Sequence, residues 1–90
     1  MSIVAVIAKI MPISPETDLE VIKSKASEKL EKEGAQNISF EEQDVAFGLK
    51  AIMIKFAWPE EKDTNIIESA LSNIENVSSA TIEDYRRAFG

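Results

Sequence analysis

Few side chains in this sequence could take part in chemistry. It holds three pairs of adjacent carboxylates and one pair of adjacent arginines, and it has no cysteine and no histidine. Without a thiol or an imidazole, it lacks the usual nucleophile, general base and transition-metal ligands. Covalent catalysis would have to use carboxylates, lysines or hydroxyls alone. We therefore expect a protein that is not an enzyme, has no catalytic residues and binds no metal or cofactor.

The charged pairs have two interpretations, one structural and one functional. Adjacent acids are usually solvated charges of strand edges and loops. Arg86 and Arg87 are the only arginines in the chain, and arginine presents a planar fork that suits carboxylate and phosphate groups. They could form a salt bridge with Asp84 within the fold or a contact with a partner. The acid pairs are Glu41-Glu42, Glu60-Glu61 and Glu83-Asp84.

Length and charge limit the class of protein. Ninety residues with 44% hydrophobic content suit one globular domain spanning residues 1–90. The net charge of −6 argues against nucleic acid as a direct partner, because binding to phosphates needs a basic surface. The apolar N-terminal stretch is shorter than the roughly 20 residues of a membrane span and has no basic residues before it. We expect a cytoplasmic protein without a membrane partner.

Alternation of apolar residues predicts a first strand from Ile3 to Met11. Both of its faces are largely apolar, so it should be central in a sheet, and Pro12 and Pro15 should end it. A helix should follow, with Thr17 as its N-cap in a capping box with Glu20. Its predicted buried face consists of Leu19, Ile22, Ala26 and Leu30, and Gly34 should form its C-terminal cap.

The second half repeats the pattern of strands and helix. Residues 37–43 favour an edge strand and Phe47 to Trp58 a central one. A second helix should be capped by Asp63 or Thr64, with an apolar stripe along one side. A last strand is expected from Val77 to Glu83, followed by a C-terminal tail. The stripe consists of Ile67, Ala70, Leu71 and Ile74.

The order β-α-β-β-α-β predicts an α+β, ferredoxin-like fold, a four-stranded antiparallel sheet with two helices on one face. The other face of the sheet would then be open, with several apolar side chains partly exposed. Such a face indicates either a partner or dimer contact, or the apolar exposure that is ordinary in small domains. The side chains concerned are Ile7, Leu49, Ala51 and Met53.

The aromatic–glycine pair Phe47-Gly48 stands where the predicted hairpin enters the central strand. A glycine at such a place usually marks a bend, a bulge or a close approach of the backbone. The fold alone cannot assign a function to it. Three uses of the fold lack their residues here: soft-metal carriage without cysteines, acyl-phosphate hydrolysis without an arginine in the first loop, and RNA binding without exposed aromatics among basic residues. A small-molecule-sensing or protein-interaction module remains an alternative.

Several stretches, in this order and spacing, resemble the archaeal translation elongation factor 1-beta family over essentially the whole chain. They are Ile7-Ala8-Lys9-Ile10-Met11-Pro12-Ile13-Ser14-Pro15, Asp18-Leu19-Glu20, Val45-Ala46-Phe47-Gly48-Leu49, Ile74-Glu75-Asn76-Val77-Ser78 and Asp84-Tyr85-Arg86-Arg87.

The resemblance implies a guanine-nucleotide exchange factor that binds elongation factor 1-alpha in its nucleotide-free and GDP-bound forms. It also implies two contact regions. One is the turn Phe47, Gly48 and Leu49, and the other is the C-terminus, here Arg86, Arg87 and Phe89. Eukaryotic relatives have a C-terminal lysine that reaches toward the magnesium site of the GTPase. The last seven residues of this chain contain no lysine.

Overall fold

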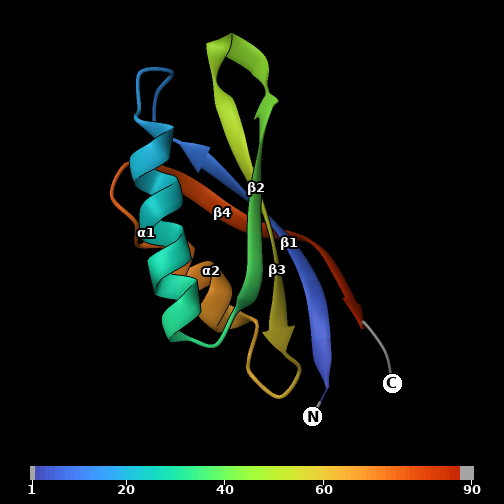
Figure 1. Ribbon diagram of the computed structural model, residues 1–90. Helices are drawn as coiled ribbons and strands as arrows, with labels where there is room; N and C mark the ends of the chain where they lie inside the picture. Colours follow the sequence, from blue (N-terminus) through green and yellow to red (C-terminus); the bar gives the residue numbers. More distant parts are fainter. Residues whose placement is uncertain (1, 88–90) are drawn as a thin grey trace.

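A computed structural model describes residues 2–87, which form a four-stranded antiparallel sheet with two helices packed on one face (Figure 1). The strand order is β2-β3-β1-β4, so β1 and β3 are central, and the ferredoxin-like fold is confirmed. The elements are β1 (Ile3–Pro12), α1 (Leu19–Lys32), β2 (Gln36–Asp44), a 3₁₀ turn (Ala46–Gly48), β3 (Lys50–Pro59), α2 (Asn65–Ser72) and β4 (Val77–Arg87).

The core lies between the sheet and the two helices. Along β1 the alternate residues Val4, Val6, Ala8 and Ile10 are completely buried, as their spacing predicts. Trp58, near the end of β3, is the largest buried side chain, and its Nε1–H donates to the carbonyl of Lys62 at 3.3 Å. Within residues 2–87, no helix is long and apolar enough to cross a membrane.

Helix α1 buries the predicted residues Ile22, Ala26 and Leu30, but its N-cap is Asp18 and not Thr17. The Asp18 carboxylate accepts the backbone N–H of Glu20 at 3.0 Å, and a charged acceptor is a stronger cap at the positive end of a helix. Thr17 instead shares a hydrogen bond with the Ser14 hydroxyl at 3.3 Å.

The end of α1 explains why a glycine follows it. Gly34 has a φ of +104°, the Gly34 N–H donates to the Glu31 carbonyl at 3.1 Å, and the Ala35 N–H donates to the Leu30 carbonyl at 3.0 Å. This pair of bonds is a Schellman motif, which needs a residue in the left-handed region. The predicted cap at Gly34 is therefore confirmed, and it turns the chain into β2.

Three boundaries differ from the prediction by more than one residue. Strand β3 begins at Lys50 and not at Phe47, because residues 46–48 form a turn that leaves the ladder. Strand β4 continues to Arg87, four residues beyond Glu83, because β1 is long enough to pair with it as far as Val4. Helix α2 ends at Ser72, so the buried Ile74 lies after it.

The start of α2 uses both residues predicted to cap it. Thr64 occupies the N-cap position without a side-chain hydrogen bond, and Asp63 Oδ1 accepts the Asn65 N–H at 2.8 Å.

The open face of the sheet is less apolar than predicted. Ile7, Leu49 and Met53 are partly exposed, as expected, but Ala51 is completely buried. A methyl group on a central strand lies below the level of the longer side chains around it, so it loses contact with solvent without a second layer.

Candidate functional site

The turn between β2 and β3 projects one aromatic ring into solvent. Phe47 is 93% exposed. The turn that carries it, Ala46–Gly48, lies at one end of the elongated molecule (Figure 1). Backbone bonds close the turn on both sides of the ring. The Val45 N–H donates to the Leu49 carbonyl at 2.9 Å, and the Leu49 N–H donates to the Ala46 carbonyl at 3.3 Å. Phe47 is therefore held outward by an ordered turn.

The backbone at Phe47 is strained. It has φ +62° and ψ +31°, and Gly48 follows with φ +76°, so two successive residues are left-handed. That conformation costs a residue with a Cβ roughly 1–2 kcal/mol, whereas glycine adopts it freely. The exposed ring returns almost no burial energy within the chain. A bulky residue kept in this state favours a contact with another molecule. Leu49, the third predicted residue, is only half-exposed.

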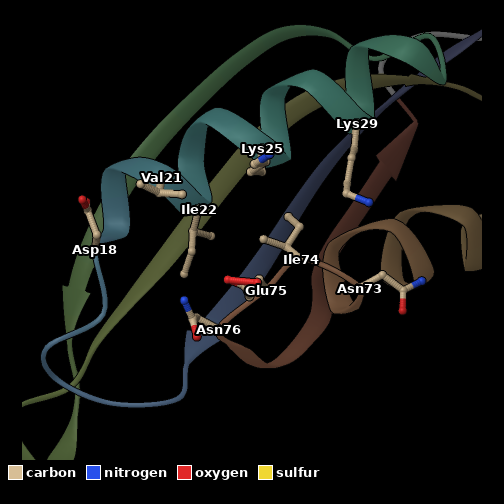
Figure 2. Close-up of a pocket in the computed structure, with 9 residues that line it drawn as sticks. All are labelled: Asp18, Val21, Ile22, Lys25, Lys29, Asn73, Ile74, Glu75 and Asn76. Carbon is tan, nitrogen blue, oxygen red and sulfur yellow. The ribbon is translucent and has the colours of Figure 1, made fainter.

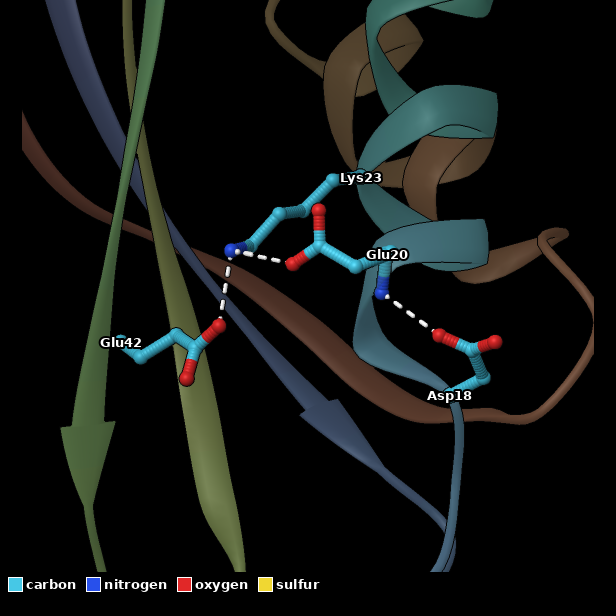
Figure 3. Close-up of polar contacts among 4 residues, drawn as sticks. All are labelled: Asp18, Glu20, Lys23 and Glu42. Carbon is cyan, nitrogen blue, oxygen red and sulfur yellow. Dashed lines mark hydrogen bonds and ion pairs between the residues drawn. The ribbon is translucent and has the colours of Figure 1, made fainter.

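Lys23 joins α1 to the hairpin arm that carries the turn (Figure 3). The Lys23 ammonium lies 2.7 Å from Glu42 Oε2 on β2 and 3.0 Å from Glu20 Oε2 on its own helix. Only 19% of the Lys23 side chain is exposed. Hydrogen bonding to Glu42 and then to Glu20 raises the pKa of Lys23. The same bond from Lys23 lowers the pKa of Glu42. Spacing along the sequence did not reveal this bridge.

The two arginines lie in β4, not in a separate tail. Arg86 Nε is 3.0 Å from Asp84 Oδ2, which confirms the predicted salt bridge within the fold. Arg87 Nε is 2.7 Å from Glu60 Oε2, a pairing between distant parts of the chain that was not predicted. Both side chains remain about three-quarters exposed, at 78% and 75%. Phe89, the third predicted residue of this region, lies outside the described residues.

The two predicted contact regions lie at opposite ends of the sheet. Ala5, near the start of β1, is opposite Arg86, whereas Ile10 is opposite Ile52, five residues after Phe47. At about 3.3 Å per strand residue, the turn and Arg86 are roughly 30 Å apart. Figure 1 shows the turn at the top and the end of β4 at the lower right. The fold does not bring these residues together, so they cannot form a single pocket.

The loop between β1 and α1 lies beside the Phe47 turn. A Cβ built on Gly48 would lie 4.0 Å from Pro15 Cβ, an ordinary van der Waals distance. Ile13, two residues earlier, is 60% exposed. Sequence reasoning did not assign Ile13 to the site. The signal that could have found it is an isoleucine between two prolines, where neither strand nor helix would bury it.

A groove of about 340 Å³ separates α1 from the loop after α2 (Figure 2). Two ammonium groups, Lys25 and Lys29, and two carboxylates, Asp18 and Glu75, line it. Mixed charges of this kind favour no one class of ligand. Among residues 2–87, no group of three or more potential ligand side chains is placed to hold a metal ion.

Comparison with known proteins identifies one family that this chain resembles over almost its whole length. The pattern of the EF-1 guanine nucleotide exchange domain matches residues 5–88. A Methanothermobacter thermautotrophicus protein named elongation factor 1-beta is 38% identical over 80 residues, which are 88% of this chain and 89% of that protein. Proteins of the same name from Metallosphaera sedula (37% over 84 residues, 91% of each chain) and Halobacterium salinarum (34% over 88 residues, 97% of this chain and 99% of that protein) are similar to it.

Proposed function

Because this chain belongs to the EF-1 guanine nucleotide exchange domain family, we propose that it promotes exchange of GDP for GTP on elongation factor 1-alpha. The exchange would regenerate the form of this GTPase that binds aminoacyl-tRNA. The partner would be bound in its GDP-loaded and nucleotide-free states. The observation that carries the proposal beyond family membership is Phe47, a 93% exposed ring on a closed, strained turn.

Exchange of this kind makes and breaks no covalent bond, which suits a chain without histidine or cysteine. The factor must bind the nucleotide-free GTPase more tightly than the GDP-bound one. By linkage, it then weakens the affinity of the GTPase for GDP by the same factor. Phe47 can act as a wedge, a rigid apolar group inserted into the partner, because its turn is already ordered before binding.

The end of β4 would supply the second contact. Arg86 and Arg87 each form an ion pair through Nε with an acid of the chain, and both side chains stay largely exposed. A cation near a bound magnesium ion competes with it for carboxylate and phosphate oxygens. In this chain an arginine would take the part that a C-terminal lysine has in eukaryotic relatives.

The wedge is tested by the release of fluorescent GDP from purified elongation factor 1-alpha. Wild type should accelerate release, and Phe47→Ala should lose roughly 10-fold or more of that acceleration, since about 1.5–3 kcal/mol of ring burial would be lost. Val21→Ala is the matched control, because Val21 is a 52% exposed apolar residue on α1. A folded Phe47→Ala protein with the wild-type release rate would eliminate the wedge.

The arginines are tested separately, by point variants. Truncation before Asp84 would remove part of β4 from its pairing with β1, so loss of activity could reflect loss of the fold. Replacing both Arg86 and Arg87 with alanine keeps the strand. The double variant should release GDP several-fold more slowly at equal stability; full activity would remove both arginines from the mechanism.

A further inference from the structure

The chain offers a second exposed apolar residue next to the Phe47 turn. Ile13 is 60% exposed in the loop between β1 and α1. This loop is ordered by its own bonds: the Ile13 N–H donates to the Asn76 carbonyl at 3.0 Å, and the Thr17 N–H donates to the Ser14 carbonyl at 3.2 Å. An apolar side chain displayed by an ordered loop loses little entropy when a partner covers it.

The Ile13 loop and the Phe47 turn form one surface. Gly48 is next to Phe47, Pro15 is two residues from Ile13, and a Cβ on Gly48 would come within 4.0 Å of Pro15 Cβ. The turn and the loop are therefore neighbours at this end of the molecule. The turn joins β2 to β3 and the loop follows β1. Because the end of β1 pairs with the start of β3, the turn and the loop lie at the same end of the sheet, and a partner that receives the ring also faces the loop.

Carboxylates surround this apolar end. Glu16 and Asp18 follow Ile13 along the loop, and Asp44 ends β2 just before the turn. All three are exposed, and in the described part of the chain none of them forms an ion pair. Lys50, opposite Asp44 in the ladder, is the nearest cation in register. The surface thus combines two exposed apolar side chains with three carboxylates close to them in sequence, here called the acidic rim. Protein interfaces commonly have an apolar centre and a polar rim.

We propose that Ile13 is a second anchor for the GTPase, and that Ile13 and Phe47 together enter an apolar cleft of that partner with a basic rim. This inference rests on the proposed function and names a residue that the wedge alone does not include. The acidic rim has the same sign as the net charge of −6, so the two together attract this end of the sheet to the basic rim of the cleft.

The test compares Ile13→Asp and Ile13→Ala with wild type in the release of fluorescent GDP from purified elongation factor 1-alpha, over a range of factor concentrations. Truncating a central apolar anchor commonly costs about 10-fold in affinity, and placing a charge there costs more. Val21→Asp is the control, because it adds the same charge to an apolar residue of similar exposure on α1. It should stay within about twofold of wild type. Melting temperatures establish that all variants are folded.

The outcomes separate this inference from the proposed function. If wild type accelerates release and Phe47→Ala does not, while a folded Ile13→Asp keeps the wild-type rate, the anchor is wrong and the exchange function stands. If wild type does not accelerate release, the exchange function is wrong, and the affinities of wild type and Ile13→Asp for the nucleotide-free GTPase decide on the anchor. No binding by wild type overturns both.

The acidic rim has its own readout. Replacing Glu16 and Asp44 with their amides should slow association with the GTPase at low ionic strength and leave dissociation nearly unchanged. An association rate that keeps its wild-type salt dependence would remove the rim from the proposal.

Discussion

Replacing Phe47 with glycine should separate stability from activity. In the free protein Phe47 is 93% exposed, so removing its ring should remove few packing contacts within the chain. The left-handed backbone at φ +62° becomes unstrained once the Cβ is gone. In the complex with the GTPase, the same change removes the whole proposed contact. We therefore expect a protein about as stable as wild type, or slightly more stable, that exchanges nucleotide poorly.

The magnitudes follow from the geometry at Phe47. Relief of the left-handed strain contributes about 1–2 kcal/mol, and the greater freedom of glycine in the unfolded chain offsets about 0.5–1 kcal/mol of it. The small buried part of the ring, roughly 15 Å², costs about 0.4 kcal/mol. The free energy of unfolding should change by between about −0.4 and +1.1 kcal/mol. Exchange activity should fall by roughly 10- to 100-fold.

Urea denaturation with a common slope gives the first quantity, and release of fluorescent GDP gives the second. Phe47→Ala is the matched variant, because it removes the ring and keeps the Cβ. It should be less stable than Phe47→Gly and equally inactive. A loss of more than about 1 kcal/mol in Phe47→Gly would show that the ring supports the fold. A stable Phe47→Gly protein with full activity would refute the contact itself.

Two further predictions concern the stability of the fold. Gly34→Ala should cost more unfolding free energy than Gly48→Ala, about 2 against about 1 kcal/mol by urea denaturation. The φ of +104° at Gly34 is far from the left-handed minimum at about +57°, whereas the φ of +76° at Gly48 is close to it. Equal costs would contradict this reasoning. Lys23→Gln should lower the melting temperature at neutral pH. The pKa of Glu42 is lowered from 4.5, so the difference in melting temperature between the variant and wild type should disappear as pH falls below 4.5. The pKa of Lys23 is raised from 10.5, so the same difference should also disappear as pH rises above 10.5. A difference that does not shrink as pH is lowered through 4.5 would show another origin.

The buried faces could be predicted because burial imposes a period. Every second residue of β1 and every third or fourth of α1 must reach the same core, and Val4, Val6, Ile22 and Leu30 show that spacing. The resemblance to elongation factor 1-beta relied on the order of longer stretches and is confirmed by the family match. The period of burial is a local property of each strand or helix, and the resemblance depends on the order of stretches along the chain. Neither requires knowledge of contacts between distant residues.

The boundaries were less predictable, for reasons that differ from one to the next. Thr17 and Asp18 are both good caps, and only the geometry of the loop chooses between them. The apolar residues from Phe47 onward have high strand propensity, which carries no information about a positive φ. The extension of β4 to Arg87 depends on the length of β1, its distant partner in the ladder.

The candidate site shows the same division. Phe47 and the two arginines were predicted as contact residues, but the exposure of the ring and the separation of the two regions by the length of the sheet were not predicted. Ile13 was not predicted as a site residue, because its exposure and its proximity to the turn depend on how two loops far apart in sequence are arranged. The Arg87–Glu60 pair likewise depends on β4 reaching the level of the loop after β3.

On the proposed function, a contact at each end of the sheet makes binding to the GTPase bivalent. With the Phe47 end in place, Arg86 is confined to within roughly 30 Å of its target, which corresponds to a millimolar effective concentration. Each contact can then be weak on its own and still form quickly once the other has formed. Either one can also open while the other keeps the factor attached. On the proposed function, an incoming nucleotide has to displace only one end at a time, so a tightly bound factor can still leave the GTPase quickly.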